Sequence, residues 1–309
     1  MNGFGANNKN QKLNRKPISI TPSIEQIINK AIKLQLSGNI NEASKNYKYC
    51  LDNGINDPRV FCNYGLILRA LGDLDKAQLL MEKSIMINPN DKLALNNLSG
   101  ILKDLGKYNE AEDILKKCLK IDQRDSTTYN NLGTILIYQG KIEEAEIILK
   151  KAISINKNDQ DVYLNLGILM RSTNKIDEAI KYTQKAIDIK PNNPEAFCNL
   201  GEFFRISGDY KKSIANYKKV LNLNESNTTA KSGLINCKGL ICDWNNQDIE
   251  DKWKNDVGIN GEPVNPYLFF LYDDNPINHL KRSKKYAKKI FNKKKIVDFQ
   301  KKKVGKIRI

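Results

Sequence analysis

Six asparagines recur at a fixed spacing of 34 residues, and they are the side chains whose chemistry repeats along this sequence. They are Asn29, Asn63, Asn97, Asn131, Asn165 and Asn199. A primary amide offers two donors and a carbonyl acceptor, so it can pair with both the N–H and the C=O of an extended peptide, whatever that peptide's side chains are. Asparagine is a poor residue for a helix interior. We predict that this asparagine column binds peptide backbone, and hydrogen bonding between neighbouring helices is the structural alternative.

The same 34-residue period appears in other residue types and predicts which elements carry the asparagine column. A glycine column holds Gly38, Gly72, Gly106, Gly140 and Gly208, with Asn174 replacing one glycine. An alanine column holds Ala43, Ala77, Ala111, Ala145 and Ala179, with Ser213 closing it. Six such units fill Ile24–Asn227, and a fixed period of this length is typical of stacked helix pairs.

Each unit reads as two amphipathic helices joined by a tight turn. In Ser126–Asp159, apolar residues three and four apart form one stripe on each helix. We expect Gly133 to allow close approach of the partner helix, and Gly140 to end the first helix in a left-handed conformation. The stripe residues are Tyr129, Leu132, Gly133 and Leu136, then Ala145, Leu149 and Ala152.

This recurring pattern resembles the tetratricopeptide repeat family over Ile24–Asn227, as in Tyr163, Leu166, Gly167, Met170, Ala179, Ala186 and Pro191. The resemblance implies an all-α, right-handed solenoid whose concave groove is lined by the first helices and by the asparagine column. Lys30 and Ala31 replace Leu-Gly in the first repeat, as expected for a polar capping unit. The expected repeats are 24–57, 58–91, 92–125, 126–159, 160–193 and 194–227, with a closing helix at 228–241.

The remaining residues, 242–309, have no 34-residue period. Asn275-Pro276 predicts a helix start, and the helix is expected to run to about Asn292. Lys281–Lys295 would supply its basic face, and Ile277, Leu280, Tyr286, Ile290 and Phe291 are available for packing.

This segment is similar to bacterial members of the O-linked N-acetylglucosamine transferase family. The similarity rests on Cys242-Asp243-Trp244, the stretch Asn265–Pro276, Tyr286-Ala287 in the basic helix, and Lys306–Ile309. The resemblance implies that residues 242–309 join the repeats to a catalytic region beyond this sequence, and that Lys306–Ile309 begin its first β-strand. It also implies acidic residues one turn before the asparagines, which Asp161 and Glu195 satisfy. Arg59, Leu93 and Thr127 do not.

The net charge of +16 is concentrated near one end, because Lys281–Arg308 alone carries +13. We interpret this run as a solvated surface, with nucleic-acid or membrane-surface binding as a third, weaker alternative. No zinc spacing connects the six cysteines with His279, the single histidine, so we expect no metal and no cofactor. No apolar run reaches a membrane span. Residues 1–23 are predicted to be a disordered leader without signal-peptide features, which favours the cytoplasm.

These features predict a protein-interaction module that binds extended peptide segments of other proteins, with no catalytic residues of its own. The peptide-binding residues would be the six asparagines with Asp161 and Glu195. The module would be the substrate-recognition arm of a protein O-glycosyltransferase lacking its catalytic region. The alternative is a free-standing scaffold that assembles protein complexes. No residue pattern specifies the partner or an oligomeric state.

Overall fold

Helices form every regular element in the residues that the structure describes. The structure, a computed structural model, describes residues 23–241, 253, 257–260, 263–264 and 276–290. Fourteen helices and no strand occur within these ranges, so the predicted all-α fold is confirmed. The predicted leader lies almost wholly outside the described residues, as do Cys242-Asp243-Trp244 and Lys306–Ile309. The chain divides into two compact units, Met1–Ile114 and Leu115–Ile309, and each is described by itself.

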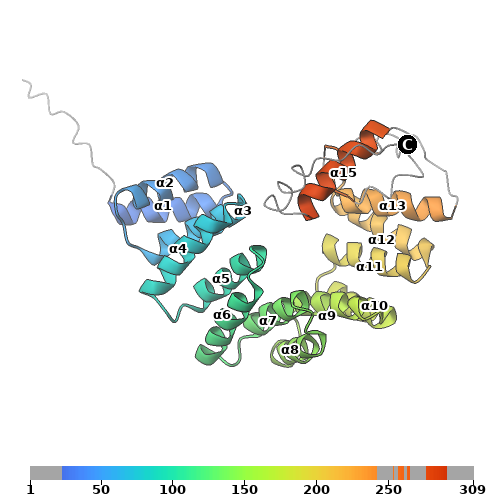
Figure 1. Cartoon of the computed structure of the whole chain (residues 1–309), viewed down its shortest axis with the longest axis horizontal. Helices are drawn as coiled ribbons and strands as arrows, with labels where there is room; N and C mark the ends of the chain where they lie inside the picture. Colours follow the sequence, from blue (N-terminus) through green and yellow to red (C-terminus); the bar gives the residue numbers. More distant parts are fainter. Residues whose placement is uncertain (1–22, 242–252, 254–256, 261–262, 265–275, 291–309) are drawn as a thin grey trace, which may run out of the picture. The chain divides into compact units, whose positions relative to one another are not determined.

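The helices of both units follow one another as pairs (Figure 1). The first unit contains α1 (Ile24–Leu36), α2 (Ile40–Asp52), α3 (Pro58–Ala70), α4 (Leu74–Ile87) and α5 (Lys92–Asp104), and α6 (Tyr108–Ile121) crosses the boundary. The second contains α7 (Ser126–Tyr138), α8 (Ile142–Ile155), α9 (Gln160–Ser172), α10 (Ile176–Ile189), α11 (Pro194–Ile206), α12 (Tyr210–Leu223), α13 (Thr228–Leu240) and α15 (Pro276–Ile290). Within each unit, the two helices of a pair are in contact, and the first helices of successive pairs also touch.

Short polar caps and left-handed residues set the ends of these helices. The Asp125 side chain accepts hydrogen bonds from two backbone N–H groups at the start of α7. The turn after that helix uses Gly140 at φ 76°, and the equivalent turn after α9 uses Asn174 at φ 60°. Asparagine is one of the few residues besides glycine that tolerates this region. The structure therefore explains why Asn174 can stand in the glycine column.

Small residues let the two helices of a pair approach closely. A Cβ atom added to Gly133 of α7 would lie 2.6 Å from Leu149 of α8, and Leu149 is fully buried. Ala145, in the alanine column, is also fully buried. The predicted close approach at Gly133 is thus confirmed, because any larger side chain would have to displace Leu149.

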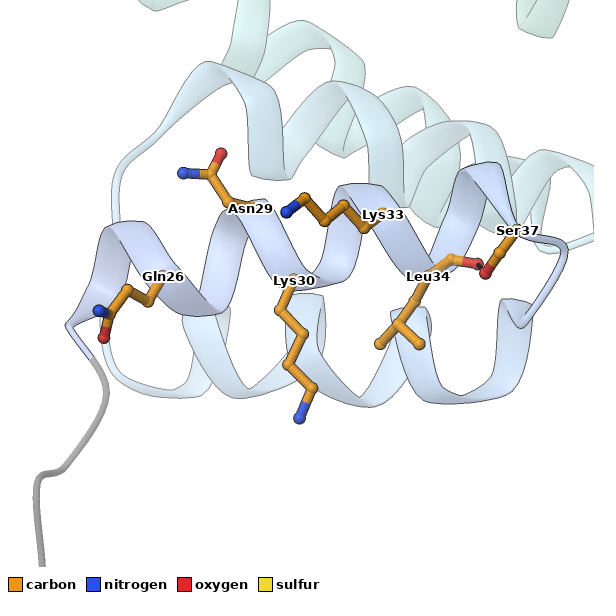
Figure 2. A pocket seen from close by; sticks show the side chains of 6 residues that line it. All are labelled: Gln26, Asn29, Lys30, Lys33, Leu34 and Ser37. Atoms are coloured by element: carbon orange, nitrogen blue, oxygen red, sulfur yellow. Dashed lines mark hydrogen bonds between the residues drawn. The ribbon is translucent and has the colours of Figure 1, made fainter.

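One side of α1 carries mainly polar residues. A hollow of about 670 Å³ lies there, and Figure 2 shows Lys30 and Leu34 extending to the same side of the helix. Gln26 and Lys33 also line this hollow, at positions that hold the buried Val60 and Ile67 one repeat later. The side on which a preceding repeat would pack is therefore polar, as a capping unit requires.

The opposite end is covered by residues that follow α13. Ile235 of α13 forms a small apolar cluster with Val257 and Val264, and Trp253 packs against it. The ammonium group of Lys231 lies 5.3 Å from the centre of the Trp253 ring. These contacts replace the second helix that would otherwise cover α13.

Helix α15 packs differently from the sequence-based expectation. Ile277 and Leu280 are available for packing in the sequence pattern, but they are 62% and 54% exposed, whereas Arg282 is fully buried. The reason is a polar contact, since Arg282 Nε donates to the carbonyl oxygen of Val257 at 3.0 Å. The described contacts therefore hold this helix through a charged side chain on backbone and not through Ile277 or Leu280.

Candidate peptide-binding surface

The asparagine column lies on the first helices of the pairs. The first unit carries Asn29 on α1, Asn63 on α3 and Asn97 on α5, and the second carries Asn131 on α7, Asn165 on α9 and Asn199 on α11. Asn29 is exposed and the other five are half-buried. Because the first helices of neighbouring pairs are in contact within each unit, each set of three asparagines follows one face of its unit.

Asn165 is bonded to the preceding first helix. Its Nδ2 donates to Asn130 Oδ1 at 2.8 Å and to Thr134 Oγ1 at 3.1 Å, and both acceptors are on α7. These partners precede Asn165 by 35 and 31 residues, which is close to the 34-residue repeat. Asn130 and Thr134 were not identified from the sequence as site residues. Inspecting the positions 35 and 31 residues before Asn165, which lie next to and one turn beyond Asn131 on α7, would have found them.

The asparagines of the first unit make a more varied set of contacts. Asn97 Nδ2 donates to Cys62 Sγ at 3.7 Å, a weak hydrogen bond to the preceding first helix. Asn29 Nδ2 donates to Glu25 Oε1 of its own helix at 3.1 Å. Burial raises the pKa of Tyr47 to about 12, and a hydrogen bond with Asn63 partly opposes that rise. The inter-helix alternative is thus realised in part of the column.

Asn199 differs from the rest, because its buried Nδ2 has no hydrogen-bond partner. The positions 35 and 31 residues before Asn199, equivalent to Asn130 and Thr134 for Asn165, hold Leu164 and Ile168. These two side chains offer no hydrogen-bond acceptor. A buried donor without a partner costs about 1–3 kcal/mol. Asn199 therefore occupies the same repeat position as Asn165 but lacks the hydrogen bond to the preceding first helix.

The side-chain oxygens of the column make fewer hydrogen bonds than its side-chain nitrogens. In Asn97, Asn165 and Asn199 the side-chain oxygen accepts no hydrogen bond from any described residue. An amide whose nitrogen is held by a neighbouring helix still has its acceptor available. The two roles considered for the column are therefore compatible in a single side chain.

Exposed side chains one helical turn earlier flank the column. In the first unit Arg59 forms an ion pair with Glu25, with Nη2 2.7 Å from Oε2, and this hydrogen bond lowers the pKa of Glu25. In the second unit Asp161 and Glu195 are exposed, and their carboxylates form no ion pair with the described residues. The residues beside the column are thus neutralised by an ion pair at Glu25, whereas Asp161 and Glu195 are exposed acidic side chains.

The described residues contain neither a metal-binding cluster nor a membrane-spanning helix. No group of three or more histidine, cysteine, aspartate and glutamate side chains is arranged there to hold a metal ion. No helix among the same residues has the length and apolar content needed to cross a membrane. Five cysteines among the described residues form no disulfide bond: Cys50, Cys62, Cys118, Cys198 and Cys237.

Family comparisons agree with the repeat architecture. Models of the tetratricopeptide repeat match residues 58–91, 93–158, 124–192 and 182–215, which together span more than half of the chain. The chain belongs to the tetratricopeptide repeat family. Its fold is an all-α solenoid of such repeats, and members of this family serve as protein-interaction scaffolds. No curated protein matches the sequence.

Solved structures of similar fold come from several bacteria. A thermophilic tetratricopeptide repeat protein of Thermus thermophilus is 23% identical, with a TM-score of 0.54, over 58% of this chain and 98% of that one. PilF of Pseudomonas aeruginosa is 19% identical, with a TM-score of 0.54, over 74% and 96%. A tetratricopeptide repeat protein of Parabacteroides merdae is 16% identical, with a TM-score of 0.60, over 84% and 97%. At these identities the likeness concerns the fold alone.

Proposed function

We propose that this chain is a protein-interaction module that binds extended peptide segments through the asparagine column. The observation that carries the proposal is the state of the amides. Among the described residues, the oxygens of Asn97 and Asn165 remain available while their nitrogens are bonded to a neighbouring helix, and the Nδ2 of Asn199 has no partner. Such side chains can accept hydrogen bonds from the backbone N–H groups of a peptide. A half-buried position strengthens these bonds relative to bulk water.

Recognition by this column would depend on backbone rather than on sequence, since every non-proline residue carries an N–H. The exposed carboxylates of Asp161 and Glu195 add a preference for segments with basic side chains near Asn165 and Asn199. We propose residues 24–241 as the binding module and residues 242–309 as the segment that connects it to further structure.

The finer proposal is that the module is the substrate-recognition arm of a protein O-glycosyltransferase. It rests on the sequence resemblance of residues 242–309 to the O-linked N-acetylglucosamine transferase family, and most of these residues lie outside the described ranges. The coding sequence downstream of codon 309 provides the test. An open frame leading into a two-lobed nucleotide-sugar domain supports the proposal. A stop codon with no such region nearby favours the alternative, a free-standing scaffold.

Peptide binding itself can be tested with a displayed library of random 12-residue peptides. We expect the wild-type chain to enrich peptides that share no strict side-chain motif. The variant N131A/N165A/N199A should lose at least about tenfold in affinity for them, which corresponds to about 1.4 kcal/mol. The matched control N158A/N192A/N222A removes three exposed asparagines outside the first helices and should bind normally. Equal affinity of the two variants would leave the column a structural role only.

Backbone recognition can be tested independently by modifying the selected peptides. Methylation of its backbone nitrogens removes the N–H donors and leaves the side chains unchanged. We expect N-methylation at alternate residues to weaken binding to the wild-type chain but to have little further effect on N131A/N165A/N199A. Full affinity of the methylated peptide would show that side chains, and not backbone, are recognised.

A further inference from the structure

Helix α15 is anchored on the second unit by two of its six basic residues. Arg282 is fully buried, and its Nε donates to the Val257 carbonyl oxygen at 3.0 Å. One turn later, Lys285 Nζ donates to the Ile259 carbonyl oxygen, also at 3.0 Å. Both acceptors belong to the turn at residues 257–260, which packs on α13 through Val257. The orientation of α15 about its own axis is therefore fixed.

The outward side of α15 carries three exposed lysines beside two exposed aliphatic residues, and we call this surface the basic stripe. It consists of Ile277, Leu280, Lys281, Lys284 and Lys288, all of them exposed. Lys281, Lys284 and Lys288 are three and four residues apart, so they share one face along about 10 Å of helix. None of these lysines forms an ion pair with a described residue, and α15 contains no acidic residue. Within the part of the chain that the structure describes, the stripe is therefore positive and has no ion-pair partner.

We propose that the basic stripe is a docking site for an acidic amphipathic helix of a partner protein. Carboxylates three and four residues apart on such a helix would face the three lysines. Apolar residues at one end of that helix would cover Ile277 and Leu280, which are otherwise 62% and 54% exposed. This site is distinct from the asparagine column and goes beyond the function proposed for it.

Two other anionic partners fit the stripe less well. A helix that binds a lipid surface buries a broad apolar face, but the outward side of α15 offers only Ile277 and Leu280 as exposed large apolar residues among those described. A nucleic acid would neutralise the lysines, yet it would leave Ile277 and Leu280 without an apolar contact, and the stripe has no aromatic side chain for stacking. Only a protein segment satisfies both the charged and the apolar parts.

The test uses the full chain and a synthetic 18-residue helical peptide as probe. The peptide carries glutamates spaced to match the three lysines and leucines near one end, and a scrambled peptide of the same composition is the reference. Fluorescence anisotropy would compare the wild-type chain with K281E/K284E/K288E and with the control K157E/K181E/K218E. The control changes the net charge equally at three exposed lysines elsewhere in the second unit. Circular dichroism would confirm that all three proteins are folded.

We expect K281E/K284E/K288E to lose about tenfold or more in affinity for the probe, because three attractions become repulsions. The control should lose less than about threefold. The neutral variant K281Q/K284Q/K288Q should fall between the wild-type chain and K281E/K284E/K288E, and I277S/L280S should weaken binding at high salt, where ion pairs are screened.

Three results would overturn the proposal. The first is equal weakening by the stripe and control variants, since that would indicate attraction by net charge alone. The second is the absence of any difference between the probe and its scrambled reference. The third is tighter, stripe-dependent binding of a 20-base-pair DNA duplex or of phosphatidylcholine–phosphatidylserine vesicles, which would assign the stripe to another class of partner.

Discussion

Alanine at two equivalent asparagines should have opposite consequences for stability. Asn165→Ala removes two hydrogen bonds, to Asn130 at 2.8 Å and to Thr134 at 3.1 Å. With about 0.5–1.5 kcal/mol net for each bond, the loss in the free energy of unfolding is about 1–3 kcal/mol. The site is half-buried, so water can reach part of it, and we expect the lower half of this range.

Asn199→Ala removes no hydrogen bond and takes away a buried donor that has no partner. Both variants gain the same increase in helix propensity, about 0.5 kcal/mol or more. The difference between the two variants therefore combines the hydrogen bonds lost at Asn165 with the relief of the unpaired donor at Asn199. We expect Asn199→Ala to be as stable as the wild-type chain or more stable, and Asn165→Ala to be less stable than Asn199→Ala by about 2 kcal/mol or more.

The measurement is urea unfolding followed by circular dichroism, combined with amide hydrogen exchange. Exchange is needed because repeat arrays can unfold locally, so that a global midpoint understates a change at one interface. In Asn165→Ala, exchange should accelerate in α7 and α9. A double-mutant cycle with Asn130→Ala should recover part of the loss as a coupling energy. Equal destabilisation by Asn165→Ala and Asn199→Ala would refute the assignment of the two roles.

Three other predictions concern packing and ionisation. Lys151→Met should destabilise the chain by about 0.5–1 kcal/mol, because Lys151 Nζ lies 4.6 Å from the centre of the Tyr129 ring. Lys181→Met, at an exposed lysine without a ring contact, is its control in urea unfolding. Gly233→Ala should cost about 1–3 kcal/mol and lower the melting temperature, since the new Cβ would clash with the buried Tyr217 ring. Burial raises the pKa of Cys198 from 9.0 to about 11, so its thiol contribution to stability is present below about pH 9 and lost as the pH rises toward 11. In a Cys242→Ser background, labelling of Cys198 by a disulfide reagent should be slow at pH 8 in the folded chain and fast in urea. Fast labelling of the folded chain would contradict the burial.

The repeat architecture could be predicted from the sequence because it follows from local rules repeated six times. The period places Gly133 opposite Leu149, and the left-handed turn at Asn174 follows from the glycine column in which it stands. Each of these features depends on residues within one helix pair. Repetition then removes the ambiguity that a single pair would leave.

The end of the chain was harder to predict because its packing depends on single contacts without a period. Arg282 was assigned to a solvated basic face, yet it is buried on the Val257 carbonyl. Hydropathy favours Ile277 for burial and Arg282 for solvent, but a guanidinium that meets a backbone acceptor can be buried with its stem. No rule of amphipathic spacing identifies that acceptor 25 residues away.

The asparagine column could be predicted from the sequence only in part. Its register could be read from the sequence, but the partner of each amide depends on the repeat before it. That partner is Cys62 for Asn97 and the pair Asn130 and Thr134 for Asn165, while Asn199 has none. Side-chain orientation decides which amide groups are used, and it is set by packing that the sequence does not display.

This variation bears on why asparagine occupies the register at all. If bonding between first helices were its only role, asparagine at position 199 would carry two costs without a return. It is a poor helix former, and its buried donor is unsatisfied at about 1–3 kcal/mol. Alanine there would keep the same helix and avoid both costs. A ligand that draws the Asn199 amide out of its buried position and accepts a hydrogen bond from its Nδ2 would offset these costs only when it is bound, so that stability lost in the free chain would add to affinity. The unpaired amide of Asn199 is thus the strongest structural reason to regard the column as a binding surface.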